Sequence, residues 1–273
     1  MSDLPEEQRE LLLAYGRGGE EWSRLRLAIR DDPARAKWMS ENLLLELFRA
    51  YDVARLAGMG EERGPFERAR DELVFLSDAS TPLLVELLSA KDGIVPVVSA
   101  DVLRKIGEPA VPEVARALAH EDPRARRAAA ELLGDLPHVG PEEDDLQNRL
   151  ARLAREDPEW LVRAQAARSL GLRGANHRTT ETARHGLVAL LSDEDPAVSR
   201  EAAQALRLLD DPAAVPALLN YAQRTERAAD SRGNTAAQEA LQALTRTQGT
   251  RNARAWRDLW RDHSTELLDP GPR

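Results

Sequence analysis

Histidines beside acidic residues are the side chains best suited to metal binding or proton transfer, and the chain has five histidines. His177 and His185 are eight residues apart, which is not the i, i+4 spacing that places two ligands on one face of a helix. His138 lies close to Glu142 and Glu143, where a loose surface cation site competes with a solvated acidic loop. We favour the loop, and we predict no metal and no cofactor.

Other catalytic patterns are weak or missing. Gly16, Gly18 and Gly19 surround Arg17, but no strand precedes this cluster, so we interpret it as a helix break and not as a phosphate-binding loop. The chain has no cysteine, which excludes disulfides, thiol nucleophiles and cysteine-ligated zinc or iron–sulfur sites. It has neither a P-loop nor a nucleophile-elbow pattern. These observations predict a protein without enzymatic activity.

The charge balance limits the classes of partner. Asp and Glu number 47 against 38 Lys and Arg, so the formal net charge is −9. Nucleic acids and anionic membranes repel such a chain as a whole, although a local basic stripe remains compatible with it. The first residues lack the pattern of a secretory signal, and no run of about 18 apolar residues occurs. We expect a soluble cytoplasmic protein that binds no membrane, and we do not expect nucleic acid as its partner.

Three Asp-Pro pairs reveal the elements that must position any site. Asp122-Pro123, Asp157-Pro158 and Asp195-Pro196 each precede an alanine-rich run of helical length. Aspartate accepts hydrogen bonds from free N–H groups at a helix start, and proline suits the first helical position because it has no N–H to leave unpaired. The first two runs end in Leu-Gly, and we expect Gly134 and Gly171 to end those helices. Each Asp-Pro pair therefore predicts a helix start.

Residues 80–249 read as about five units, each with a first helix, A, and a second helix, B. The turn aspartates at 92, 122, 157 and 195 are 30, 35 and 38 residues apart, which indicates a repeat with loop insertions. We place these loops at Pro137–Asp145, Leu172–Thr179 and Arg224–Thr235. Adjacent alanines near the end of each B helix predict close approach of neighbouring helices.

Both ends of the array need a cap. Residues 1–79 read as four helices of an N-terminal cap, in which Asp32 caps a long helix that stops near Gly58 and Gly60. Residues 250–273 carry a closing helix, where Trp256 and Trp260 are spaced i, i+4 and can cover the last apolar face. An aromatic pair that binds a partner is the alternative. We expect the tail from Asp269 to be disordered.

The repeated pattern resembles compact bacterial HEAT repeats, similar to those of the phycobilin-lyase HEAT-like group, whose units read D-P-x-V-R-x-x-A-A-x-A-L-G. Unit two has Ala125-Arg126 for V-R, and in unit three Val162-Arg163 follows a two-residue insertion. The resemblance implies an all-α, right-handed α-solenoid. It also implies a ladder in which Arg126 and Arg163 pair with turn aspartates.

Some HEAT enzymes must be considered beside this resemblance. Those resembling deoxyhypusine hydroxylase carry several His-Glu dyads that build a di-iron site. Here His120-Glu121 is a single dyad, and it lies before the Asp-Pro turn. A HEAT-type lyase, or a glycosylase-like enzyme with a basic concave face, stays open as an alternative.

The remaining candidate is a surface stripe on the B helices. Counting back from the last Leu or Ile of each B helix, the second and sixth positions share a face. Arginines occupy these positions in four units: Arg104, Arg127, Arg168 and Arg200. They are either ordinary solvated residues or a concave groove for an acidic peptide or protein. We predict a non-enzymatic scaffold that binds a protein partner along this stripe.

Overall fold

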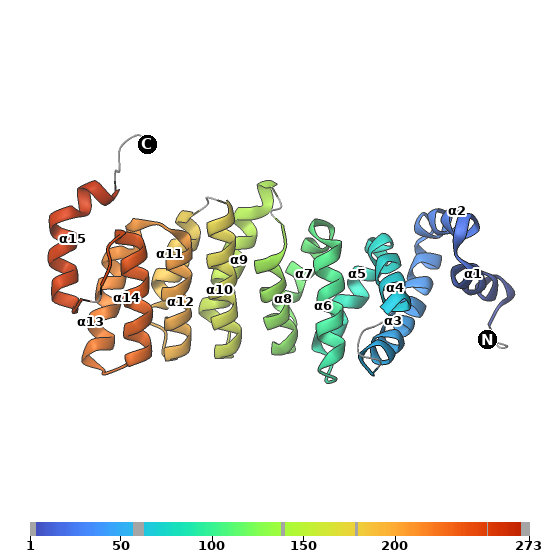
Figure 1. The fold of residues 1–273 in the computed structure, drawn as a ribbon, viewed down its shortest axis with the longest axis horizontal. Helices are drawn as coiled ribbons and strands as arrows, with labels where there is room; N and C mark the ends of the chain where they lie inside the picture. Colours follow the sequence, from blue (N-terminus) through green and yellow to red (C-terminus); the bar gives the residue numbers. More distant parts are fainter. Residues whose placement is uncertain (1–3, 57–62, 138–139, 178–179, 250, 269–273) are drawn as a thin grey trace. The chain divides into compact units, whose positions relative to one another are not determined.

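The computed structural model describes residues 4–56, 63–137, 140–177, 180–249 and 251–268 (Figure 1). Within these ranges the chain is helical and has no β-strand. It divides into two compact units, Met1–Ala110 and Val111–Arg273. The predicted all-α fold of stacked helix pairs is confirmed.

Over its described residues, the first unit contains six α-helices. They are α1 (Glu6–Arg17), α2 (Gly19–Arg30), α3 (Pro33–Leu56), α4 (Arg63–Phe75), α5 (Ser77–Glu86) and α6 (Ile94–Ile106). Asp32 caps α3 as predicted, because its Oδ1 accepts hydrogen bonds from the N–H groups of Ala34 at 3.0 Å and Arg35 at 3.2 Å. The predicted stop near Gly58 and Gly60 lies outside the described residues.

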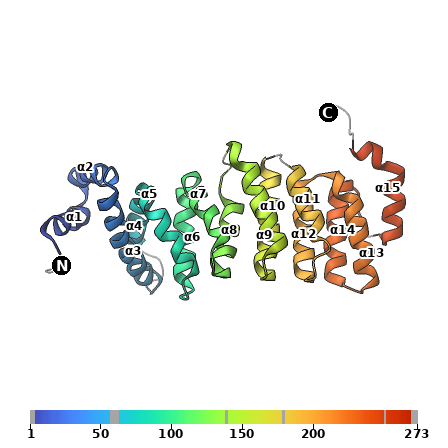
Figure 2. The ribbon, with the colours of Figure 1, turned by 180° about the vertical axis from the view of Figure 1, so that it is seen from behind.

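The second unit contains nine α-helices over its described residues. They are α7 (Val111–Arg116), α8 (Pro123–Asp135), α9 (Glu143–Glu156), α10 (Trp160–His177), α11 (Thr180–Leu190), α12 (Pro196–Leu209), α13 (Val215–Arg227), α14 (Ser231–Thr245) and α15 (Ala253–Leu268). The B helices α8, α10, α12 and α14 pack against one another in this order and form one row. The A helices lie along one side of this row (Figures 1 and 2). The five predicted pairs run from α5/α6 to α13/α14.

Gly171 does not end its helix, which corrects our expectation, because α10 continues to His177. Gly134 lies one residue before the end of α8 at Asp135, close to the predicted stop. A Cβ on Gly134 would lie 3.2 Å from Ser169 Cα, and one on Gly171 would lie 2.8 Å from Ala205 Cα. These glycines therefore allow successive B helices to touch at backbone level, α8 against α10 and α10 against α12.

Two of the three predicted loops are mostly helical. Leu172 to His177 continue α10, and only residues 228–230 separate α13 from α14. In the third, a 3-10 turn at Gly140–Glu142 leads directly into α9. The buried side of α10 continues past Gly171, and this favours a longer helix over a loop.

The closing helix buries one tryptophan. Trp256 is fully buried, and its Nε1–H donates to Gln238 Oε1 of α14 at 2.7 Å. Trp260 is half-buried. Among the described residues, no helix combines the length and apolarity needed to cross a bilayer. The predicted tail from Asp269 lies outside the described residues.

Candidate functional site

The predicted arginines lie on the B helices. Arg127 of α8 and Arg168 of α10 are exposed, and Arg200 of α12 is half-buried. Arg104 is exposed on α6, in the first unit. We call Arg127, Arg168 and Arg200 the arginine stripe. It occupies three successive helices of one row in the second unit.

Helix geometry explains why these side chains point away from the row. Arg127 and Arg200 each lie four residues after the first residue of their helix, so they occupy equivalent positions. Arg168 follows Leu161 and Gln165 at i+7 and i+3, which places all three on one face of α10. Ala129, Ala166 and Ala202 are fully buried, and each lies two residues from a stripe arginine, which places it on the opposite side of the helix. Burial of the small residues therefore fixes the direction of the stripe.

A shallow hollow lies at one end of the stripe. It has a volume of roughly 340 Å³ and is lined by Arg200 and Gln204 of α12 and by Arg232, Thr235 and Glu239 of α14, among others. Neither Arg200 nor Arg232 forms an ion pair with any residue that the structure describes. The same holds for Arg127 and Arg168 in the described ranges. These guanidinium groups can therefore receive carboxylates from another molecule.

The implied ladder has two rungs, and only the first uses a predicted turn aspartate, since Arg163 pairs with Asp193 and not with Asp195. Arg126 of α8 donates to both carboxylate oxygens of Asp157, at 2.6 and 2.9 Å. Arg163 of α10 donates to both oxygens of Asp193, at 3.0 and 2.9 Å. Hydrogen bonding to these carboxylates raises the pKa of Arg126 and of Arg163. The four side chains are largely buried, so they hold the turns of adjacent repeats together.

Asp157 is therefore not a helix N-cap, which corrects the reading of the second Asp-Pro pair. Helix α10 begins at Trp160, and the carbonyl of Glu159 accepts its first backbone bonds, from Val162 and Arg163. Asp157 instead accepts from Arg126 and from the N–H of Glu159. In contrast, Asp122 and Asp195 cap α8 and α12 as predicted. The two-residue insertion shifts the helix start and frees the Asp157 carboxylate for the ladder.

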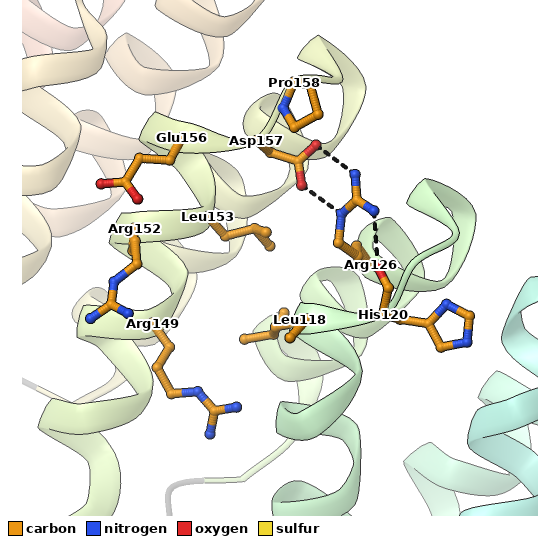
Figure 3. A pocket seen from close by; sticks show the side chains of 10 residues that line it. Leu118, His120, Arg126, Arg149, Arg152, Leu153, Glu156, Asp157 and Pro158 are labelled. Atoms are coloured by element: carbon orange, nitrogen blue, oxygen red, sulfur yellow. Dashed lines mark hydrogen bonds and ion pairs between the residues drawn. The ribbon is translucent and has the colours of Figure 1, made fainter.

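A second hollow lies beside the first rung (Figure 3). It has a volume of roughly 410 Å³, and Arg149, Arg152, Leu153 and Glu156 of α9 line it together with the Arg126–Asp157 pair. Arg149 donates to the carbonyl of Ala115 at 2.6 Å, which ties α9 to α7. Most of its polar side chains already form hydrogen bonds: Arg126 with Asp157, Arg149 with the carbonyl of Ala115, and Glu156 with Arg155. This hollow is therefore chiefly part of the repeat-to-repeat connection.

Sequence reasoning missed a buried ion pair. Arg173 of α10 donates through Nε to Glu143 of α9 at 2.7 Å, and a second bond joins the same groups. The guanidinium also donates to the carbonyls of Leu133 and Leu136 at the end of α8. Both charged side chains are buried. The buried stripe Ala166, Leu170 and Arg173, spaced i, i+4 and i+7, is the signal that could have found it.

In the part of the chain that the structure describes, the histidines do not gather with other metal ligands. No group of three or more His, Asp or Glu side chains in the described ranges is arranged to hold a metal. His120 accepts a hydrogen bond at Nδ1 from the N–H of Asp122, 3.0 Å away. His185 is exposed on α11. His138 and the side chain of His177 lie outside the described residues.

Three solved structures are similar to this chain at low sequence identity. The chain is similar to an engineered protein at 20% identity, covering 76% of this chain and 96% of that one, with a TM-score of 0.44. It is similar to YibA of Escherichia coli at 19% identity, covering 78% and 82%, with a TM-score of 0.47. Human deoxyhypusine hydroxylase, in complex with glycerol, is similar at 20% identity, covering 90% and 93%, with a TM-score of 0.40. Among curated proteins, none matches.

The sequence itself matches one family model. The model describes HEAT repeats, and it matches residues 81–171 and 146–244, which together make up more than half of the chain. These ranges include both rungs of the ladder and the B helices that carry the arginine stripe. The chain belongs to the HEAT-repeat family.

Proposed function

We propose that this protein is a non-enzymatic scaffold that binds an acidic peptide or an acidic protein surface along its B helices. The observation that carries the proposal is the arginine stripe. Its three guanidinium groups lie on successive helices, at or near the surface, and within the described part of the chain none is neutralised by an ion pair. Arginine binds carboxylates through two parallel hydrogen bonds, so such a row favours an acidic partner.

The hollow between α12 and α14 supports the same partner class. Arg200 and Arg232 line it, and both are available for a carboxylate. Charge pairs of this kind accelerate association and select partners more than they add affinity. We further propose that the chain is a cytoplasmic protein of the compact bacterial HEAT type.

Nucleic acid is the competing polyanion. The net charge of −9 opposes it more strongly than it opposes an acidic peptide, because nucleic acid carries a much higher density of negative charge. A HEAT-type enzyme would need a pocket that concentrates acids and aromatics, and no Phe, Tyr or Trp is among the residues that line the two hollows described above. Both observations support a scaffold.

Charge reversal of the stripe tests the proposal. The test variant is Arg127→Glu/Arg168→Glu/Arg200→Glu. The matched control is Arg152→Glu/Arg227→Glu/Arg254→Glu, which changes three exposed arginines of α9, α13 and α15 by the same total charge. Both variants and the wild type are immobilised, and partners are captured from the native host and identified. Circular dichroism verifies that all three proteins are equally helical.

We expect the wild type and the control to recover the same acidic protein, and the stripe variant to lose it. Recovery of the same partners by all three proteins would show that the stripe is not the binding face. Separately, labelled DNA and RNA are titrated at low salt. The wild type could bind nucleic acid tightly, with an affinity that falls steeply with salt and is lost in the stripe variant. That result would show that the stripe binds nucleic acid and not an acidic protein.

A further inference from the structure

Two large apolar side chains lie exposed at the start of α10. Trp160 is 41% exposed and Leu161 is 44% exposed. The equivalent positions of α8 are Pro123 and Arg124, and those of α12 are Pro196 and Ala197. Helix starts normally carry small or polar residues that satisfy free N–H groups. Capping and core packing do not require an exposed Trp-Leu pair at this place.

Leu161 lies on the arginine stripe's face of the row. It precedes Arg168 by seven residues, which corresponds to nearly two full turns of α10. Arg127 of α8 and Arg200 of α12 occupy the helices on either side of α10. Leu161 therefore lies on the middle helix of three, between arginines on both flanking helices.

Resting on the proposed function, we infer that the partner segment is an extended acidic peptide with one bulky apolar residue between its acids. The apolar residue contacts Trp160 and Leu161, and the acids pair with Arg127 and Arg200. Tryptophan and arginine dominate the binding energy of protein interfaces, and a polar rim around an apolar anchor is their usual arrangement. Arg127 and Arg200 select the two acids of the peptide, and Trp160 and Leu161 select its central apolar residue.

The helix row also sets the spacing of the motif. Neighbouring packed helices have axes about 8–10 Å apart, so the path from α8 to α12 spans roughly 16–20 Å. An extended chain advances about 3.3 Å per residue. The two acids should therefore be about five or six positions apart, with the apolar residue near the midpoint.

Fluorescence anisotropy with two labelled peptides tests this inference. The first peptide carries glutamates about six positions apart and a central phenylalanine, and the second replaces that phenylalanine with serine. Each is titrated against wild type, Trp160→Ala/Leu161→Ser, the stripe triple variant, and Leu45→Ser. Leu45 is 59% exposed on α3 in the first unit and serves as the matched apolar control.

We expect wild type and Leu45→Ser to bind the phenylalanine peptide about tenfold more tightly than the serine peptide. Trp160→Ala/Leu161→Ser should bind both equally and weakly, and the stripe variant should bind neither. Equal affinity of wild type for both peptides, with loss in the stripe variant, would overturn the apolar anchor and leave the scaffold proposal standing. Binding of neither peptide by wild type, or unchanged binding by the stripe variant, would contradict the scaffold proposal itself.

Discussion

Asp122 and Asp157 both precede a proline, but their carboxylates accept different hydrogen bonds. Asp122 accepts from the backbone N–H of Arg124 at 2.8 Å and from the guanidinium of the same residue. Asp157 accepts from Arg126 of the preceding repeat. One carboxylate therefore stabilises its own helix start, and the other joins two repeats.

The pKa of Asp122 reports the hydrogen bonds that its carboxylate accepts from Arg124. Hydrogen bonds from the side chain and backbone of Arg124 lower this pKa from 3.8 to about 2. Because the folded-state pKa is depressed, the stabilisation is present above about pH 4 and is lost as the pH falls toward 2. We expect Arg124→Gln to raise the carboxyl midpoint partway toward 3.8, since the backbone donor remains. Carbon NMR of the Asp122 carboxyl measures it, and an unchanged midpoint would show that the side chain does not bond there.

The first rung of the ladder should contribute to stability as a pair. We expect Arg126→Met to lower the free energy of unfolding by about 1–3 kcal/mol, because it leaves the buried Asp157 carboxylate without its charged donor. Adding Asp157→Asn should cost little more, since the interaction is already lost. Urea denaturation of the two single variants and the double variant measures the coupling. Fully additive losses would mean that the rung carries no interaction energy.

The length of α10 decides how the repeats pack. Because α10 continues to His177, Gly171 meets Ala205 of α12 and Arg173 reaches Glu143 of α9. A helix that ended at Gly171 would make only the earlier contacts. The element that looked like a short B helix therefore connects α8, α9 and α12.

A methyl group at Gly171 should disturb this contact. Its Cβ would lie 2.6 Å from Ala205 Cβ and 2.8 Å from Ala205 Cα, so the helices must move apart. We expect Gly171→Ala to lower the free energy of unfolding by about 1–3 kcal/mol. Gly16→Ala is the control, because a Cβ there meets nothing within 4 Å. Adding Ala205→Gly should recover part of the loss, and equal stability of both single variants would contradict the close packing.

The Arg173–Glu143 pair predicts a larger effect. Arg173→Met should cost about 3–5 kcal/mol in urea denaturation, because Glu143 and two carbonyls of α8 lose their buried donor. The double variant Arg173→Met/Glu143→Met should be more stable than the single variant, since no buried charge remains unpaired. A single variant as stable as the wild type would mean that the pair is not buried in solution.

Most elements of the fold follow from the sequence because Asp122-Pro123 and Asp195-Pro196 mark helix starts and the apolar period marks helix faces. The helix ends were predicted less well. A Leu-Gly pair can mark either the end of a helix or a place where a neighbouring backbone packs closely. For Gly171, only the position of Ala205 in the structure distinguishes the two cases. The same ambiguity hid Arg173, because it follows Gly171 in what read as a loop.

At the scale of the whole molecule, an acidic protein carries local positive charge on one row of helices. The net charge is −9, yet Arg127, Arg168 and Arg200 lie at or near the surface of successive B helices. Helical periodicity predicts which face of its own helix each arginine occupies, because that face depends only on the spacing of residues within the helix. The hollow formed with Arg232 could not be predicted, because it depends on how α14 packs against α12.

The most direct measurement follows the arginine Nε–H signals by NMR while the acidic phenylalanine peptide is added. We expect the signals of Arg127 and Arg200 to shift, because their guanidinium groups gain carboxylate partners. The signals of Arg126 and Arg163 should stay in place, since both are already bound to aspartates. Shifts confined to arginines outside the stripe, such as Arg227 of α13, would contradict binding along the B helices.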